Sequence, residues 1–412
     1  MNTQSAPLLI QSNLVSYQTV CDTELNIIGV EILGESLPLN ADELAIPVIE
    51  NAILHAFLYA STDALFGQRK VFIKTSEAFL MGSALLILPK DRIVLELLPC
   101  LNVSPELIAR FSELKNLGYQ LALDAWIPDD ARKPLLPYVA FIKVSMANTE
   151  QVHLTVQQLA NNTSRLLATH VNNAQQLALA KSLNVKFLQG QFYRVRNESI
   201  HKQQPIMMHA LLALIAELNS DGSDNTLDDF FKSNPALSLM LIQLVNSAAT
   251  AVSITSIRHA ILIIGRSKMI HWLNVMLYTL NDDNNTAGIL TQSAMWRAKF
   301  MELMCEQCHH QVSHGLDDMA FITGVISLAD VLIGEPLESI IKKMNLSDAI
   351  YSALLQRTGL LGTLLSLAES LEEGAFERVR NAAQSLNVSI TQVVSCQQES
   401  LAWANKINVQ KK

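Results

Sequence analysis

Short apolar runs alternate with longer amphipathic stretches over the first two hundred residues of the chain. Each run is bounded by polar residues or glycine, which is typical of strands in a buried sheet. The strands expected from this pattern are Ile27–Leu33, Val71–Thr75, Ile93–Leu98, Gln120–Asp124, Val139–Lys143, Arg165–Thr169 and Val185–Gln189.

The stretches between these runs carry helical periodicity. Ser104 and Pro105 have the residue types of an N-cap and a first helical position, and Gly118 is typical of a helix end. Repeated strand–helix units within about 200 residues predict a parallel (β/α) barrel of the TIM type. The expected helices are Ala41–Ala64, Pro105–Leu117, Glu150–Asn161 and Asn173–Leu183.

The second half of the chain is predicted to be all-helical. Strand patterns stop at a polar, proline-containing linker near His201–Pro205. We therefore expect an α/β barrel over residues 1–203 and a helical domain with a C-terminal helical extension over 204–412. The expected helices include one that starts at Asn234-Pro235, one over 257–264, and others over 266–280, 291–312, 318–332, 335–343, 347–356, 360–372, 374–385 and 389–406.

Composition narrows the class of protein. The chain has 412 residues, of which 50% are hydrophobic and 17% charged, so two domains are expected and disorder is excluded. No apolar run approaches the ~18–20 residues of a membrane span. The first residues lack the pattern of a secretory signal, which favours a cytoplasmic protein with no membrane partner. Five cysteines do not make a disulfide framework.

Charge argues against a nucleic-acid partner. The net charge is −8, and neither half is basic: residues 1–203 hold 16 basic and 18 acidic side chains, and residues 204–412 hold 14 and 20. A duplex-binding face needs clustered Lys and Arg to displace counterions from phosphates.

The ends of the predicted strands carry the candidate chemistry, because barrel active sites form at the carboxyl-terminal ends of strands. Polar strand ends that simply meet solvent are the alternative reading. The residues at these positions are Glu31, Lys74, Glu96, Asp124, Lys143, Thr169 and Gln189.

These strand ends resemble EAL domains, the cyclic-di-GMP phosphodiesterases. Glu31-Ile32-Leu33 is similar to the signature triplet, and the other strands follow in family order over about residues 10–203. The resemblance implies a TIM-like barrel that hydrolyses a phosphodiester with divalent cations. The matching segments are Phe72–Ser76, Glu96–Leu98, Leu123–Ala125, Phe141–Lys143, Ala168–Asn172 and Leu188–Gly190.

Departures from the family pattern decide the function expected from the sequence. Lys74 stands where the resemblance implies a metal-binding asparagine, and an ammonium has no lone pair for a metal. Ala125 and Thr169 replace two further carboxylates, and Glu35 replaces a ligand-binding arginine. We therefore expect a vestigial site with no catalytic residue, no metal and no cofactor, at which cyclic di-GMP is an unlikely ligand.

A series of short motifs marks the first part of the helical half: Asn234–Leu237, Leu244–Ala248, Ile254–Ile261 and Gly265. In these motifs the helical half resembles HDOD domains, relatives of HD enzymes that have lost the metal ligands. The resemblance implies that Ser327 and Leu328 stand where an active HD enzyme has His and Asp.

One further motif leaves two readings open. Cys305 and Cys308, followed by His309, have a spacing that suits zinc on a helix, with His314 as a further ligand; the same pattern occurs at c-type haem attachment sites. The alternative is a helix with a buried cysteine face and a solvated histidine end.

These observations lead to the expected function of the chain. The main reading is a non-catalytic bacterial signal-transduction scaffold, a pseudo-phosphodiesterase that binds an unknown protein partner through its HDOD half, with a possible homodimer. The alternative reading is a cyclic-di-GMP receptor or a residual cyclic-di-GMP phosphodiesterase.

Overall fold

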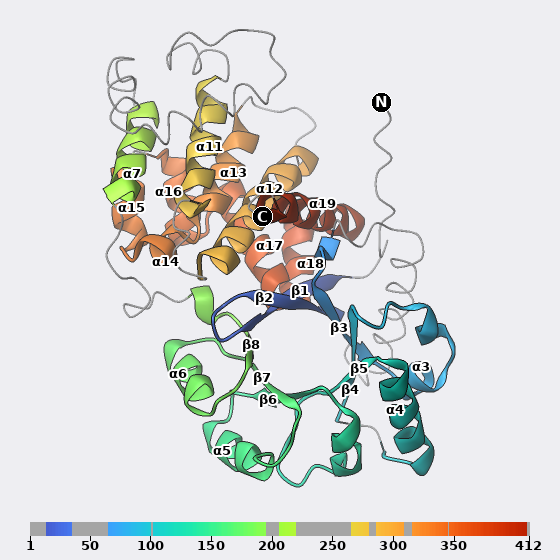
Figure 1. The fold of residues 1–412 in the computed structure, drawn as a ribbon. Helices are drawn as coiled ribbons and strands as arrows, with labels where there is room; N and C mark the ends of the chain where they lie inside the picture. Colours follow the sequence, from blue (N-terminus) through green and yellow to red (C-terminus); the bar gives the residue numbers. More distant parts are fainter. Residues whose placement is uncertain are drawn as a thin grey trace. The chain divides into compact units, whose positions relative to one another are not determined.

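The computed structural model of the chain divides into two compact units (Figure 1). The first comprises Met1–Val195 with Leu367–Lys412, and the second comprises Arg196–Ser366. The structure describes residues 14–34, 65–99, 102–194, 206–219, 265–279, 286–308, 315–344 and 346–409. The predicted helix at Ala41–Ala64, Glu35, the linker His201–Pro205 and the HDOD-like segments from Asn234 to Ile261 lie outside these residues.

Eight strands close into a barrel in sequence order, which confirms the predicted barrel. Strands β2 to β8 run parallel, whereas β1 pairs antiparallel with both β2 and β8. The sequence pattern does not predict β1. The strands are β1 Val15–Asp22, β2 Ile27–Gly34, β3 Lys70–Thr75, β4 Ile93–Leu97, β5 Gln120–Leu123, β6 Phe141–Ser145, β7 Arg165–Thr169 and β8 Phe187–Gln189.

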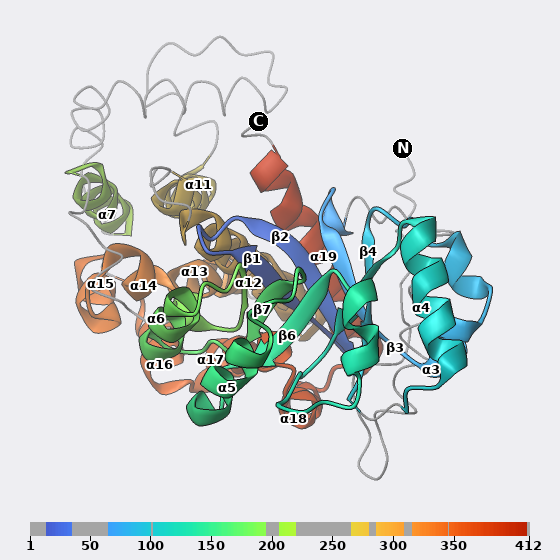
Figure 2. The same cartoon turned by 60° about the horizontal axis from the view of Figure 1, so that its bottom comes forward.

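Crossover helices lie outside the ring of strands (Figures 1 and 2). The predicted helix Pro105–Leu117 is confirmed, with the Ser104 hydroxyl accepting from the Leu107 N–H and Gly118 at a left-handed φ of 96°. The helical elements of the barrel are α3 Glu77–Met81, α4 Pro105–Leu117, α5 Thr149–Gln158 and α6 Ala174–Ser182, with short 3-10 helices η1 Ala84–Ile87, η2 Lys133–Tyr138 and η3 Phe192–Arg194.

The interior of the barrel is filled in layers because side chains alternate between the two faces of each strand. The layer nearer the amino-terminal ends of the parallel strands is apolar. Glycine at position 29 leaves space for the Phe72 ring in this layer, because a Cβ there would lie 2.7 Å from Cε2 of Phe72. The next inward position of each strand, two residues closer to the carboxyl-terminal end of the barrel, is polar. The apolar layer consists of Val20, Phe72, Val94, Ala122, Phe141 and Leu167.

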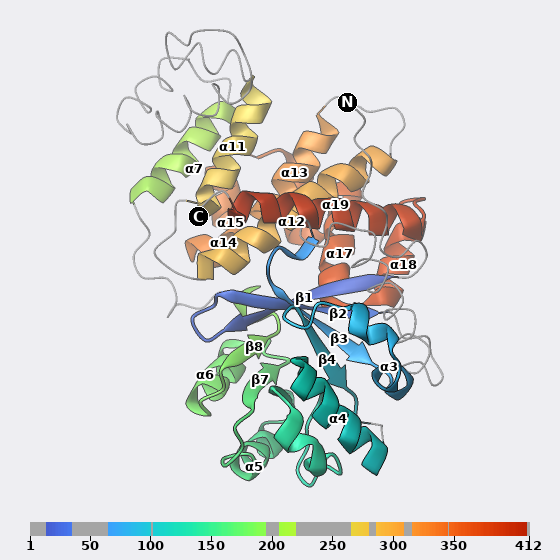
Figure 3. The same ribbon diagram turned by 45° about the vertical axis from the view of Figure 1, so that its right-hand side comes forward.

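The last helices of the chain belong to the barrel unit, which differs from the predicted boundaries. The helices are the end of α17 (Gly359–Glu373), α18 (Phe376–Ser385) and α19 (Ile390–Val409). The buried Gln397 amide donates to the Val15 carbonyl at 2.9 Å, so α19 lies beside β1 (Figures 1 and 3). Long-range contacts of this kind cannot be derived from local helical periodicity, which is why residues 367–412 were predicted to be part of the helical domain.

The described part of the second unit is helical. Gly324 lies against the backbone of Ala298, where an added Cβ would approach within 2.5 Å, so α12 and α13 pack closely. No described helix has the length and apolar character that a membrane crossing needs. The helices are α7 Ile206–Asn219, α11 Arg266–Thr279, α12 Thr286–Cys308, α13 Leu316–Ile326, α14 Ala329–Ile333, α15 Leu337–Lys343 and α16 Asp348–Gln356.

Candidate functional site

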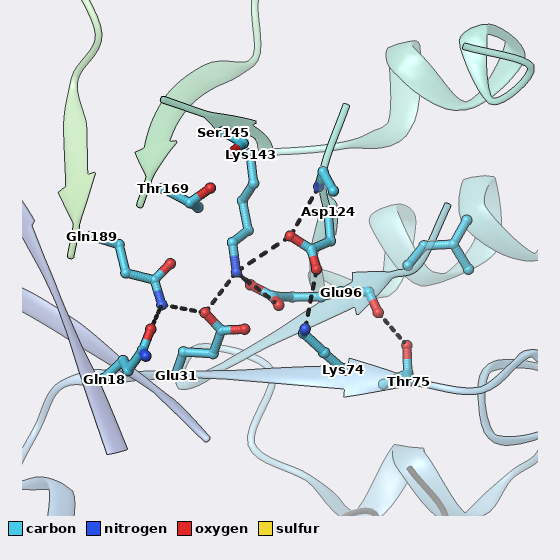
Figure 4. Close-up of polar contacts among 12 residues, drawn as sticks. Gln18, Glu31, Lys74, Thr75, Glu96, Asp124, Lys143, Ser145, Thr169 and Gln189 are labelled. Carbon is cyan, nitrogen blue, oxygen red and sulfur yellow. Dashed lines mark hydrogen bonds and ion pairs between the residues drawn. The ribbon is translucent and has the colours of Figure 1, made fainter. Parts of the chain in front are cut away.

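One polar residue from each strand, or from the residue directly after it, forms a ring above the apolar layer (Figure 4). The strand register brings them together, pairing Gln18 with Glu31 and Lys74 with Glu96. All seven residues singled out from the sequence belong to this ring, and Gln18 is the member that sequence reasoning missed, because it lies on the unpredicted strand β1. We call Gln18, Glu31, Lys74, Glu96, Asp124, Lys143, Thr169 and Gln189 the polar ring.

Lys143 is the centre of the polar ring. Its Nζ lies 2.7 Å from Oε2 of Glu31, 3.0 Å from Oε1 of Glu96 and 3.6 Å from Oδ1 of Asp124. Burial lowers the pKa of Lys143, but the charges of Asp124, Glu31 and Glu96 outweigh it and raise that pKa above its ordinary value. Lys143 is therefore a buried cation that compensates three carboxyl groups.

Lys74 is the second cation of the polar ring and the more accessible one. Its Nζ lies 3.4 Å from Oδ2 of Asp124, and 32% of its side chain is exposed, against 2% for Lys143. Burial lowers the pKa of Lys74, and the charges of Asp124 and Glu31 overcome this effect and raise it. A ligand that enters from the carboxyl-terminal end of the strands would meet this ammonium first.

The carboxyl groups of the ring differ in their protonation. Burial, reinforced by the charge of Glu31, raises the pKa of Glu96 well above its usual range. Burial also acts to raise the pKa of Asp124, but the two lysines reverse this and lower it, so Asp124 is ionised near neutral pH. The polar ring thus holds two different carboxyl groups. Asp124 is ionised and partly exposed, whereas Glu96 is fully buried and favours its protonated form.

Amide and hydroxyl groups complete the ring. The Gln189 amide donates to Oε2 of Glu31 and, at 3.0 Å, to Oε1 of Gln18. Thr169 Oγ1 lies 3.3 Å from Nδ1 of His170. Glu31 is therefore fixed from two sides, by an ammonium and by an amide.

A buried arginine shapes the segment that follows β5. Arg132 donates to the Leu97 and Asp124 carbonyls, both at 2.8 Å, and forms an ion pair with Asp130 at 2.6 Å. The Ala125 N–H donates to Oδ1 of Asp124 at 2.9 Å. Arg132 is a positioning residue for Asp124 that sequence reasoning did not find, although an arginine and an aspartate two residues apart in a polar loop are a usable signal.

The ring as arranged does not fit a divalent metal ion. Carboxylate oxygens are suitable ligands for hard cations. However, the Lys143 ammonium already lies among Glu31, Glu96 and Asp124. Within the ranges that the structure describes, no group of three or more His, Cys, Asp or Glu side chains is placed to hold a metal.

Among the described residues of the helical unit, no group of three or more His, Cys, Asp or Glu side chains is placed to hold a metal. Burial raises the pKa of the Cys305 thiol to about 11 and also raises that of Cys308, so both thiols stay protonated near neutral pH. His309 and His314 lie outside the described residues, so zinc binding remains a prediction. The Ser327 hydroxyl accepts from Nη1 of Arg297 at 3.0 Å.

Comparison with known proteins gives one relative that bears on function. The chain is 26% identical to a Vibrio cholerae serotype O1 protein named cyclic di-GMP phosphodiesterase CdgJ, over 96% of this chain and 93% of that protein. It is 20% identical to YuxH of Bacillus subtilis, named as uncharacterized, over 86% of this chain and 88% of that one.

The comparisons of folds and families add little. A FimX EAL domain from Pseudomonas aeruginosa bound to c-di-GMP matches 45% of this chain and 90% of that chain, with 17% identity and a TM-score of 0.35. No family model matches the chain.

Two expectations from the sequence are corrected by the similarity to CdgJ. The chain was expected not to be an enzyme, and cyclic di-GMP was expected to be an unlikely ligand. A relative that aligns along nearly the whole chain carries the name of a cyclic di-GMP phosphodiesterase, which overturns both expectations. They rested on single substitutions such as Lys74, whose effect depends on the neighbours that the fold gives them.

Proposed function

We propose that the barrel binds cyclic di-GMP over the polar ring and acts on it as a phosphodiesterase. The observation that carries the proposal is the convergence of eight polar side chains, one from each strand, at the end of the barrel where TIM-type enzymes have their active sites. The alignment with CdgJ supports the choice of substrate. The EAL assignment of residues 1–203 and the HDOD assignment of the helical unit are parts of the same proposal.

Binding of the ligand rests on the exposed cation. A phosphodiester carries one negative charge, and the Lys74 ammonium is the partly exposed positive group of the ring. The buried Lys143 acts indirectly, because it compensates Glu31 and Glu96 and so reduces the repulsion between these carboxylates and a phosphate. With three carboxyl groups and two ammonium groups, the ring is close to neutral when Glu96 is protonated.

Hydrolysis needs a base close to the bound phosphate. Asp124 lies beside Lys74, and its lowered pKa keeps it ionised near neutral pH. Its carboxylate is therefore available as the acceptor of a proton from water while Lys74 holds a phosphate oxygen. The water oxygen forms a bond to phosphorus, one phosphorus–oxygen ester bond breaks, and the proton passes to the leaving ribose oxygen. The product is the linear dinucleotide.

The experiment is titration calorimetry of the purified full chain with cyclic di-GMP, followed by chromatography of the reaction products, with added Mg²⁺ or Mn²⁺ and with a chelator. We expect saturable binding and formation of linear dinucleotide. Lys74→Met is expected to weaken binding by about tenfold, and Asp124→Asn to reduce turnover more than binding.

The control variant is Lys133→Met, because Lys133 is an exposed lysine that pairs with Asp129 outside the ring. It should behave as the wild type. A wild-type chain that neither binds cyclic di-GMP nor converts it would overturn the proposal, and equal losses in Lys74→Met and Lys133→Met would overturn the role of Lys74.

A further inference from the structure

An imidazole–hydroxyl pair lies at the ends of β6 and β7, outside the contacts of the two lysines. Nδ1 of His170 lies 3.1 Å from Oγ of Ser145 and 3.3 Å from Oγ1 of Thr169. His170 is exposed, and Ser145 is the register partner of Thr169, a member of the polar ring. The imidazole therefore adjoins the ring on the side where the carboxyl-terminal ends meet solvent.

The backbone at His170 is held in a conformation that favours glycine. Its φ is 55°, in the left-handed region. The chain on either side is fixed to neighbouring strands, because the Met146 N–H donates to the Thr169 carbonyl at 2.8 Å and the Val171 N–H donates to the Gln189 carbonyl at 3.1 Å. Such conformations persist where the surrounding structure over-determines them, and they cluster at functional sites.

The hydrogen bonds of Ser145 define which nitrogen of His170 can reach a ligand. Oγ of Ser145 accepts from the Ala147 N–H at 3.3 Å, so its own proton is available for Nδ1 of His170. When Nδ1 accepts, the proton of the neutral imidazole is on Nε2. The exposed side of the ring then presents an N–H donor.

Lys74 and His170 come from opposite sides of the barrel. In a closed barrel of eight strands in sequential order, β3 and β7 are four strands apart and therefore lie on opposite sides. Lys74 and Thr169, the neighbour of His170, lie on opposite sides of Lys143 (Figure 4). A cyclic dinucleotide carries two phosphodiester groups on opposite sides of its ring.

We infer that His170, oriented by Ser145, binds the second phosphodiester of the ligand while Lys74 binds the first. This inference rests on the proposed function, and it assigns one phosphodiester group of the ligand to each side of the barrel. Nε2–H donates to a non-bridging phosphate oxygen, and no bond is made or broken at His170. The left-handed backbone holds the imidazole at the mouth of the barrel.

The test compares two glycine substitutions at left-handed positions. Asn184 lies between α6 and β8, at the amino-terminal end of the barrel and away from the polar ring. It is exposed and has a φ of 55°, so its backbone conformation matches that of His170. Titration calorimetry of the full chain with cyclic di-GMP is expected to give about tenfold weaker binding for His170→Gly and unchanged binding for Asn184→Gly. Both variants should melt at or above the wild-type temperature, because glycine suits this backbone.

Phosphorus NMR of the bound dinucleotide distinguishes a direct contact from a structural role. A residue that only supports the fold would not change the chemical shift of one particular phosphate. The two phosphates become inequivalent in the site, and we expect His170→Gly to shift one resonance and Lys74→Met to shift the other. Ser145→Ala should shift the same resonance as His170→Gly by a smaller amount, because the imidazole remains but loses the hydroxyl that orients it.

The outcomes separate this inference from the proposed function. If the wild type binds cyclic di-GMP and His170→Gly binds it equally well, the inference is wrong and the proposed function stands. Equal losses in His170→Gly and Asn184→Gly, or shifts of the same resonance in His170→Gly and Lys74→Met, would also overturn the inference. A wild type that does not bind the dinucleotide would overturn both.

Discussion

Nζ of Lys143 on β6 lies 2.7 Å from Oε2 of Glu31 on β2, which joins two residues on opposite parts of the barrel through its interior. Both side chains are almost fully buried. A pair of this kind contributes little net stability compared with apolar residues of the same volume, but removing one partner leaves an uncompensated charge in the interior. The charges of the polar ring are therefore interdependent.

Lys143→Met should destabilise the chain strongly. The substitution keeps most of the side-chain volume and removes the ammonium between Glu31 and Glu96, so the free energy of unfolding is expected to fall by about 3–5 kcal/mol. Urea denaturation at neutral pH measures this change. Lys133→Met is the matched control, with an expected change within about 0.5 kcal/mol, and a similar small change in Lys143→Met would show that the buried charges do not depend on Lys143.

Asp124 should contribute stability that is lost in acid. Its pKa in the folded chain is lowered by the lysines, so the unfolded state binds more protons than the folded state between that pKa and the unfolded value of about 3.9. This contribution is complete above about pH 4 and disappears as the pH falls through the folded pKa. Stability curves of the wild type and Asp124→Asn should therefore converge on acidification, and a difference that stays constant with pH would contradict the assignment.

Arg132→Lys tests the support beneath Asp124. The guanidinium donates to two carbonyls and to Asp130, and an ammonium cannot reproduce this planar set of donors. We expect a loss of about 2–3 kcal/mol in the free energy of unfolding, because buried acceptors lose their donors. Turnover of cyclic di-GMP should fall as well, since the Asp124 carbonyl loses its donor. Unchanged stability would show that water or neighbouring groups replace the guanidinium.

The barrel could be predicted because its signal is local. Each parallel strand is a short apolar run with polar ends, and the same periodicity placed seven members of the polar ring at strand ends. Strand β1 could not be predicted in this way because Ser16, Gln18 and Thr19 interrupt its apolar pattern. Its antiparallel pairing with β2 and β8 is a non-local property that no period in the sequence reports.

The roles of the two lysines could be predicted only in part. Lys74 was recognised from the sequence as a cation among carboxylates, and it contacts Asp124. The central position belongs instead to Lys143, whose side chain extends to three strands. The stagger between the strands of the closed barrel determines which carboxylate an inward-pointing lysine contacts. This stagger cannot be derived from the spacing of residues along the chain.

The C-terminal helices lead to a prediction about which residues form an independent folding unit. Gln397 on α19 donates to the Val15 carbonyl, and Asn405 accepts from Nη1 of Arg69 at 2.9 Å, so α19 covers part of the barrel. A chain that ends at residue 203 would expose this surface, and we expect it to aggregate or to unfold without a cooperative transition.

The matched variant joins the two segments of the barrel unit directly. Arg194 and Glu372 form an ion pair, so Val195 and Leu367 can be connected by a flexible linker of about eight Gly and Ser residues. This chain should unfold in one cooperative transition in urea, and Gln397→Ala should lower its stability by about 1–3 kcal/mol, because the buried Val15 carbonyl would lose its donor. Cooperative unfolding of residues 1–203 alone would contradict the assignment of the C-terminal helices to the barrel, and would support the boundary that helical periodicity predicts.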